Sequence, residues 1–220
     1  MLEAVIFDLD GTLVDSMGIW TKVDVEFLNK RNIPIPENLF TDIESGNSFI
    51  EIAEYFKKKF GLSETIFEIM NEWTEMVAKH YKTDVKLKPG VKEFLDFLKR
   101  KNVKMGVGTS NNEYLTKTVL TANGILEYFD AIVIGSNEIK GKPFPDIFLE
   151  AAKKLKVKPE RCLVIEDVLV GVQAAKRANM KVFAVYDEYS EKDKKEIQKL
   201  ADFFANDFAG IKRAVISEYF

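Results

Sequence analysis

A hydrophobic run near the start of the chain ends abruptly in acidic residues and a glycine. The run extends from Ala4 to Phe7, and Asp8, Asp10 and Gly11 follow it. Four apolar residues rich in β-branched and aromatic types predict a buried strand, and the glycine marks the place where the chain leaves the sheet. Because side chains two positions apart on a strand point the same way, we expect both carboxylates to project together. Such carboxylates repel unless a cation or a shared proton intervenes, so the stretch predicts a metal site.

The segment between Ser16 and Lys88 shows helical periodicity and contains no strand-like run. Apolar residues at helical spacing predict a first helix that Pro34 and Pro36 end, a second at about 48–60 and a third at about 63–81. Three helices with no strand among them predict a small helical module inserted after the first strand.

From Pro89 onward, strand-like and helical segments alternate. This alternation predicts βα units and a mostly parallel sheet, and therefore the α/β fold class. The charged segment 190–200 is expected to be an exposed helix. The further strands are expected at 103–108, 131–134, 162–165, 182–185 and, as a short last strand, 203–204.

The charge balance argues against a nucleic-acid partner. The 220 residues include 32 Lys plus Arg against 35 acids, which leaves a formal net charge of -3 and no basic excess. The single cysteine, Cys162, excludes an internal disulfide and a multi-cysteine metal site. We find neither a signal peptide nor an apolar run long enough to span a bilayer. We therefore expect a cytoplasmic protein, a monomer, with no nucleic-acid or membrane partner.

Polar side chains follow several of the predicted strands. In a parallel sheet all carboxyl ends share one edge, and ligands bind in the crevice there. Any one polar turn is weak evidence, because strands often end in polar turns. A site for a phosphoryl group requires carboxylates that bind a hard cation, together with a lysine and hydroxyl groups that bind the phosphate oxygens. Besides the first two aspartates, these side chains are Thr109, Ser110, Lys142, Glu166 and Asp167.

With these motifs the chain resembles the haloacid dehalogenase superfamily, in the branch of β-phosphoglucomutases and sugar-phosphate phosphatases. The resemblance rests on DLDGTLVDS at 8–16, GKPFPD at 141–146, IED at 165–167 and the position of Thr109. It implies a Rossmann-like parallel sheet flanked by helices, formed by 1–15 and 88–220. The segment 16–87 would then be an inserted all-helical cap domain.

The resemblance also implies roles for the acids. Asp8 would attack phosphorus and form an aspartyl-phosphate intermediate. Asp10 would protonate the leaving alkoxide and then deprotonate the incoming water. Mg²⁺ would be held by Asp8, the backbone carbonyl of Asp10 and Asp167, with Glu166 in or beside the first shell of ligands.

The remaining core residues would bind the phosphate. Thr109, Ser110 and Lys142 are the expected phosphate-binding residues, and Thr109 and Lys142 count with the catalytic set. Lys142 would also pair with Asp8. Lys140 lies close in sequence, but only Lys142 precedes a proline, as the motif requires.

The cap decides between phosphatase and mutase activity. β-Phosphoglucomutases carry a histidine and a phosphate-gripping arginine at the positions occupied here by Trp20 and Phe49, and an aromatic ring cannot replace a bidentate arginine. We therefore expect a Mg²⁺-dependent phosphatase acting on a small phosphorylated metabolite, such as a sugar phosphate. The alternatives are a phosphosugar mutase and a non-catalytic protein that binds a phosphorylated ligand. Cap residues that face the substrate are expected to be Met17, Trp20, Gly46, Asn47 and Ser48.

Overall fold

The computed structural model describes residues 2–36, 39, 49–135 and 139–220. Within these ranges a six-stranded parallel sheet has the order β3-β2-β1-β4-β5-β6, which is the order of the Rossmann fold. The α/β fold class predicted from the sequence is confirmed. The strands are β1 Ala4–Phe7, β2 Lys104–Thr109, β3 Ala131–Ile134, β4 Cys162–Glu166, β5 Lys181–Val185 and β6 Phe203–Ala205.

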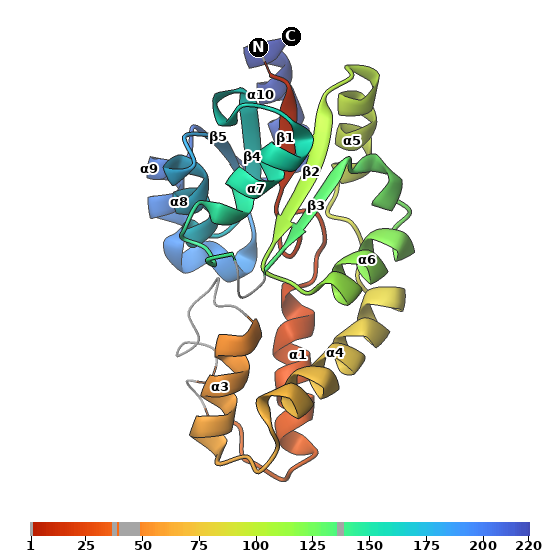
Figure 1. Cartoon of the computed structure of the whole chain (residues 1–220), viewed down its shortest axis with the longest axis vertical. Coiled ribbons are helices and arrows are strands. Elements are labelled where there is room, and N and C mark those ends of the chain that lie inside the picture. Colours follow the sequence, from red (N-terminus) through yellow and green to blue (C-terminus); the bar gives the residue numbers. More distant parts are fainter. Residues whose placement is uncertain (1, 37–38, 40–48, 136–138) are drawn as a thin grey trace.

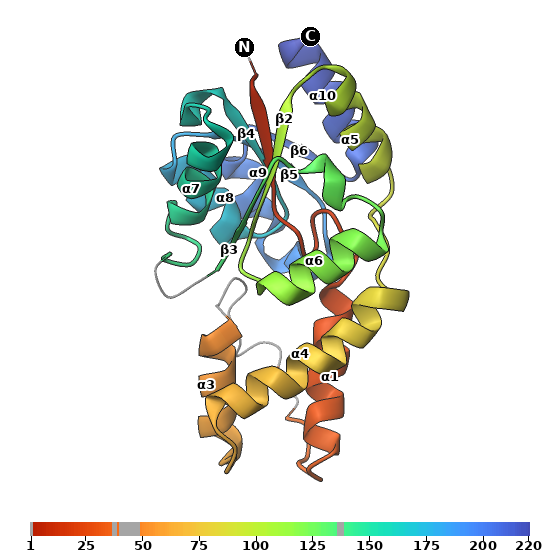
Figure 2. The same cartoon turned by 45° about the vertical axis from the view of Figure 1, so that its right-hand side comes forward.

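Helices cover both faces of the sheet, and alternate residues of β1 show why. Val5 and Phe7 point into one hydrophobic cluster, whereas Ala4 and Ile6 point into the other. Figure 2 shows the two layers of helices on either side of the strands. On the first face lie α5 Val91–Arg100, α6 Glu113–Ala122 and α10 Phe208–Tyr219; on the second lie α7 Asp146–Leu155, α8 Leu169–Arg177 and α9 Lys194–Leu200.

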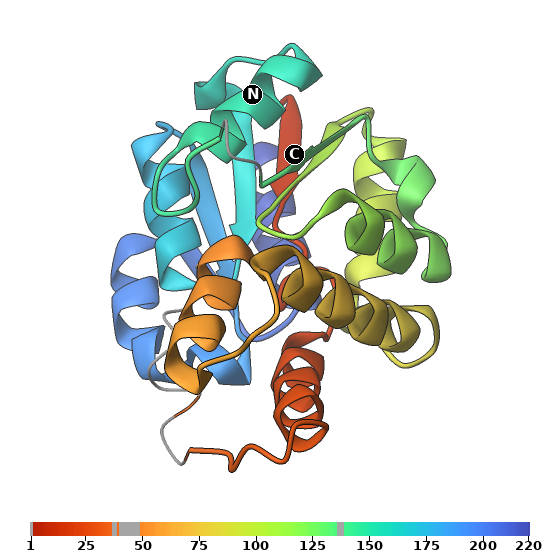
Figure 3. The same ribbon diagram turned by 60° about the horizontal axis from the view of Figure 1, so that its bottom comes forward.

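Three further helices form a separate group at one end of the molecule (Figure 1): α1 Met17–Asn29, α3 Phe49–Phe60 and α4 Ile66–Thr83. They pack around aromatic rings, with the ring centroid of Trp73 5.3 Å from that of Phe27 and 4.8 Å from that of Phe56. Figure 3 views the molecule from this end, with the three helices in front of the sheet. The inserted helical cap is thus present, while its boundaries at 15/16 and 87/88 stay a prediction.

Element ends differ from the sequence expectation at several places. Helix α1 ends at Asn29, before the two prolines expected to end it, and Asn32 follows with a φ of 54°. The exposed helix expected at 190–200 consists of a 3-10 turn, Glu188–Asp193, followed by α9. The sequence predicts no element after residue 204, where the structure has α10. None of the helices in the described ranges combines the length and the apolar character needed to cross a membrane.

Candidate active site

Three acidic side chains meet at the carboxyl edge of the sheet. Asp8 follows β1, Glu166 is the last residue of β4, and Asp167 follows it. These two strands are neighbours at the point where the strand order reverses, which is where open α/β sheets bind ligands. All three side chains are buried, and one carboxylate oxygen of each lies within 4.8 Å of the others. The predicted convergence of these acids is present in the structure.

Lys142 lies within this cluster. Its Nζ is 2.5 Å from Asp8 Oδ1 and 2.5 Å from Glu166 Oε1. The pairing with Asp8 was expected, whereas the contact with Glu166 was not. Lys140, by contrast, is exposed, and its Nζ lies over the ring of Phe144, 5.1 Å from the centroid. Only the lysine that precedes the proline therefore reaches the acids.

Both carboxylate oxygens of Glu166 have partners. Oε1 accepts a hydrogen bond from Lys142, and Oε2 accepts the backbone N–H groups of Asp167 at 2.6 Å and of Val168 at 2.9 Å. Gly171 leaves the space that this carboxylate needs, because a Cβ there would lie 1.7 Å from Glu166 Oε1. Glu166 therefore orients the lysine, and its expected place among the metal ligands stays a prediction.

Asp167 is held by the loop that follows β1. Its Oδ1 accepts the hydroxyl of Thr12 at 2.6 Å. Gly11 has a φ of +84°, and a Cβ there would lie 2.4 Å from Asp167 Oδ2. A glycine is required here both by the backbone conformation and by the close approach of the carboxylate. No described residue donates a hydrogen bond to Oδ2 of Asp167 or to Oδ2 of Asp8.

The acids of the cluster outnumber its one lysine, and burial opposes their ionisation. Burial raises the pKa of Asp8 to about 8, with Lys142 opposing the shift and Glu166 adding to it. Burial and the two neighbouring carboxylates raise the pKa of Asp167 well above its usual range. Burial acts to lower the pKa of Lys142, but the two carboxylates raise it, so the lysine stays charged. Three carboxylates and one ammonium leave a charge of -2 when ionised, and an all-oxygen donor set with that charge fits a hard divalent cation.

The carboxylate of Asp10 is not one of the three acids grouped within 4.8 Å of one another in the described ranges, although its charge contributes to raising the pKa of Asp8. The Asp10 carboxylate accepts hydrogen bonds from Ser16 Oγ at 2.6 Å, from the hydroxyl of Tyr81 and from Asn111 Nδ2 at 2.9 Å. Strand β1 ends at Phe7, so the alternation of a strand does not extend to residue 10. The role expected of its backbone carbonyl stays a prediction.

Thr109 and Ser110 lie at the end of β2, the other neighbour of β1. The hydroxyl oxygen of Thr109 accepts the backbone N–H of Asn111 at 3.1 Å, and the side chain is 2% exposed. Its hydroxyl proton is donated to no residue in the described ranges. The phosphate-binding roles of Thr109, Ser110 and Lys142 stay predictions.

Of the expected cap residues, Met17 and Trp20 lie on α1 and are half-buried. The centroid of the Trp20 ring lies 5.7 Å from that of Phe49 and 6.3 Å from that of Tyr81. The two positions at which a mutase carries histidine and arginine are thus a pair of packed aromatic rings. Gly46, Asn47 and Ser48 lie outside the described residues.

Two partners of Asp10, Tyr81 and Asn111, are not among the site residues predicted from the sequence. Tyr81 is 71 positions away in sequence, on the apolar face of a helix, and no sequence signal distinguishes it from cap core. Burial, and after it the nearby charge of Asp10, raises the pKa of this tyrosine. Asn111 directly follows the predicted Thr109 and Ser110, so its position was a usable signal.

Lys88 was also missed. Its Nζ donates to the carbonyl oxygens of Gly11 at 2.7 Å and Tyr186 at 2.8 Å, and to Asp187 Oδ2 at 2.9 Å. The first residue after the predicted cap segment therefore fixes the backbone of the loop that follows Asp8 and Asp10.

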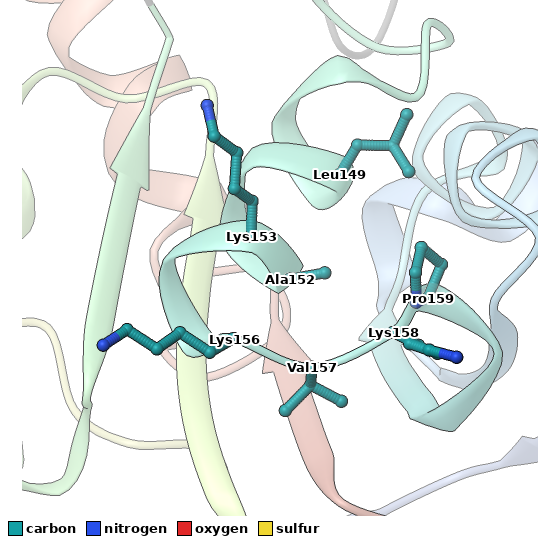
Figure 4. A pocket seen from close by; sticks show the side chains of 7 residues that line it. All are labelled: Leu149, Ala152, Lys153, Lys156, Val157, Lys158 and Pro159. Atoms are coloured by element: carbon teal, nitrogen blue, oxygen red, sulfur yellow. The ribbon is translucent and has the colours of Figure 1, made fainter.

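A surface hollow of about 420 Å³ lies away from these residues. It is formed by the end of α7 and the turn into β4 (Figure 4). Because β4 begins there, the hollow lies at the amino edge of the sheet, opposite to the acids. Its lining residues are Leu149, Ala152, Lys153, Lys156, Val157, Lys158 and Pro159.

A Rossmann-ordered sheet with buried acids and a lysine at its carboxyl edge, beneath an inserted group of helices, defines an α/β enzyme with a helical cap. The chain belongs to the haloacid dehalogenase-like hydrolases, because the model of that family matches residues 5–185. The family predicted from the sequence is confirmed, and with it the prediction that the protein is an enzyme, a phosphatase of this family.

Relatives of both reaction types are similar to this chain. The phosphorylated carbohydrates phosphatase of Thermotoga maritima is 30% identical over 179 residues, covering 81% of this chain and 82% of its own length. The β-phosphoglucomutase of Bacillus subtilis is 32% identical over 197 residues, covering 84% and 82%. The crystal structure of β-phosphoglucomutase from Clostridium difficile superimposes with a TM-score of 0.80 at 29% identity, covering 99% of this chain and 96% of that one.

Proposed function

We propose that this protein is a Mg²⁺-dependent phosphatase that hydrolyses a small phosphorylated metabolite, such as a sugar phosphate, through an aspartyl-phosphate intermediate. The observation that carries the proposal is the contact of Asp8 with Lys142 inside a buried acidic cluster. Asp8 lies at the carboxyl edge of the sheet beside a positively charged lysine, an arrangement that suits a carboxylate nucleophile attacking an anionic phosphate.

Each side chain of the cluster has a task in this proposal. An oxygen of Asp8 attacks phosphorus, and the bond between phosphorus and the alcohol oxygen breaks. The carboxyl group of Asp10 gives its proton to that oxygen, and later takes a proton from the water that cleaves the acyl phosphate. The ammonium group of Lys142 and the hydroxyls of Thr109 and Ser110 bind the phosphate oxygens.

The proposed Mg²⁺ ligands are Asp8, Asp167 and the backbone carbonyl of Asp10. Asp8 and Asp167 each retain a carboxylate oxygen to which no described residue donates, and their negative charge needs a cation. Glu166 keeps its place beside the ligands, where it holds Lys142. When bound, Mg²⁺ offsets the repulsion between Asp8 and phosphate and stabilises the charge on the phosphoryl oxygens.

The cap favours hydrolysis over mutase chemistry. A mutase must hold a second phosphate group, whereas Trp20 and Phe49 pack against each other and offer no cation. The Thermotoga maritima relative is a phosphatase of phosphorylated carbohydrates, which supports phosphorylated carbohydrates as the substrate class. The similarity to the Bacillus subtilis enzyme supports the mutase as the second candidate.

The test is phosphate release from a panel of sugar phosphates, nucleotides and short-chain acid phosphates, with Mg²⁺ and with EDTA. We expect release from the wild-type protein with Mg²⁺, its loss in Asp8→Asn, and its retention in Asp15→Asn. Asp15 is the matched control, because it lies in the same motif but is exposed. Conversion of β-glucose 1-phosphate to glucose 6-phosphate faster than phosphate release would establish the mutase instead. An inactive but folded wild-type protein that binds phosphorylated ligands would favour the non-catalytic alternative.

A further inference from the structure

Donors from three separate parts of the chain hold the carboxylate of Asp10. Ser16, at the start of the cap segment, donates to Oδ1 at 2.6 Å, and the hydroxyl of Tyr81 donates to the same oxygen. Asn111, which follows β2, donates to Oδ2 at 2.9 Å. Both oxygens of the carboxylate thus have partners, and the plane of the group is fixed from three directions.

Tyr81 differs from the other two donors because it belongs to the cap helix α4. Its side chain is completely buried. The phenol oxygen also accepts a hydrogen bond from Asn111 Nδ2 at 3.2 Å, so the proton of the hydroxyl is the group that bonds to Asp10. The phenol therefore has both a donor and an acceptor role, and its direction is set by the core as well as by the cap.

The helix that carries Tyr81 is docked on the core. Helix α4 packs along α6, as Figure 2 shows, and Asn112 Nδ2 donates to Thr74 Oγ1 of α4 at 3.4 Å. On the cap side, the ring of Trp20 lies edge-on to that of Tyr81, with centroids 6.3 Å apart. Tyr81 thus connects an aromatic residue of the cap directly to the carboxylate of the core.

We propose that Tyr81 is a positioning residue, through which the cap holds Asp10 in the orientation needed for proton transfer to the leaving alcohol. The inference rests on the proposed function, in which the bond from phosphorus to the alcohol oxygen breaks while Asp8 bonds to phosphorus. The proton of the Asp10 carboxyl group moves to the alcohol oxygen, and Tyr81 keeps its own proton. The carboxylate that remains is stabilised by the three donors, so the same contacts that orient Asp10 favour the product of the transfer.

The test compares two substrates that differ in their need for a proton. The alkoxide that leaves a sugar monophosphate requires protonation, whereas the acetate that leaves acetyl phosphate does not. In Tyr81→Phe we expect kcat/KM for the best sugar monophosphate of the panel to fall about tenfold, a part of what a general acid contributes. We expect kcat/KM for acetyl phosphate to change less than about twofold.

Tyr128→Phe is the matched control, because Tyr128 also donates its hydroxyl to an aspartate, Asp96 Oδ1 at 2.5 Å, outside the site. It should leave the ratio of the two kcat/KM values unchanged. In an Asp10→Asn background, loss of the Tyr81 hydroxyl should have no further effect on that ratio, since the acid through which it acts is gone.

The outcomes separate the two proposals. The role of Tyr81 is overturned if Tyr81→Phe lowers kcat/KM equally for both substrates. It is also overturned if loss of the Tyr81 hydroxyl changes the ratio of the two kcat/KM values as much in the Asp10→Asn background as in the wild type. Either result leaves the proposed phosphatase activity standing. A folded wild-type protein with no activity on either substrate overturns both.

Discussion

Replacement of Asp24 by asparagine should stabilise the protein in neutral and alkaline solution but not in acid. Asp24 lies on α1, is half-buried, and has no ion-pair or hydrogen-bond partner in the described ranges. Burial raises its pKa from 3.8 to about 7. The folded state therefore binds a proton more tightly than the unfolded state, so folding loses stability as the pH rises through this interval. Asparagine carries no charge and avoids this loss.

The size of the stability gain follows from the pKa shift of Asp24. At about 1.4 kcal/mol per pKa unit, the rise from 3.8 to about 7 corresponds to about 4 kcal/mol when Asp24 is fully ionised. Because the side chain retains some contact with solvent, we expect about half of this. The gain of Asp24→Asn in unfolding free energy should thus be near zero at pH 4 and about 2 kcal/mol at pH 8.

Urea unfolding of both proteins between pH 4 and pH 8.5 measures this gain. The acids of the active site titrate in both proteins and cancel in the difference. Glu54→Gln is the control, because it removes one negative charge from an exposed position of the cap helix α3 and should change stability by less than about 0.5 kcal/mol at every pH. A gain for Asp24→Asn that does not vary with pH would refute the reasoning.

Three further predictions concern the acidic cluster. Gly171→Ala should lower the unfolding free energy by about 1–3 kcal/mol in urea, because its Cβ would overlap Glu166 Oε1. Thr12→Val removes the hydroxyl that Asp167 accepts, and should raise the Mg²⁺ concentration for half-maximal phosphate release about 10- to 100-fold. The rise in melting temperature on adding Mg²⁺ should be larger at pH 8.5 than at pH 6, because protons on Asp8 and Asp167 compete with the cation below their raised pKa values; an equal rise at both pH values would contradict it.

Local sequence was sufficient for the positions of the strands and for the acids that follow them. In a run such as Ala4–Phe7, the apolar residues that indicate a strand and the polar residues that end it lie within a few positions of one another. Strand β3 has the bounds that the sequence predicted. The motif around Lys142 also predicted its pairing with Asp8, although the two residues are 134 positions apart. Element ends were less predictable, because α1 ends through the left-handed conformation of Asn32 and not at a proline.

The sequence by itself determined the α/β fold and the family, and it predicted the group of core residues proposed to carry the chemistry. Only the tertiary structure decided which side chains form hydrogen bonds with one another: Glu166 accepts from Lys142, and Asp10 accepts from Tyr81 and Asn111. The physical reason is that these hydrogen bonds join residues far apart in the sequence. The bond between Tyr81 and Asp10, 71 positions apart, depends on the packing of α4 against the core, and the bond between Asn111 and Asp10, 101 positions apart, depends on the pairing of β2 with β1. The packing of α1 against α4 places Trp20 beside Tyr81, so the rest of the cap contacts the residue that we propose to orient Asp10.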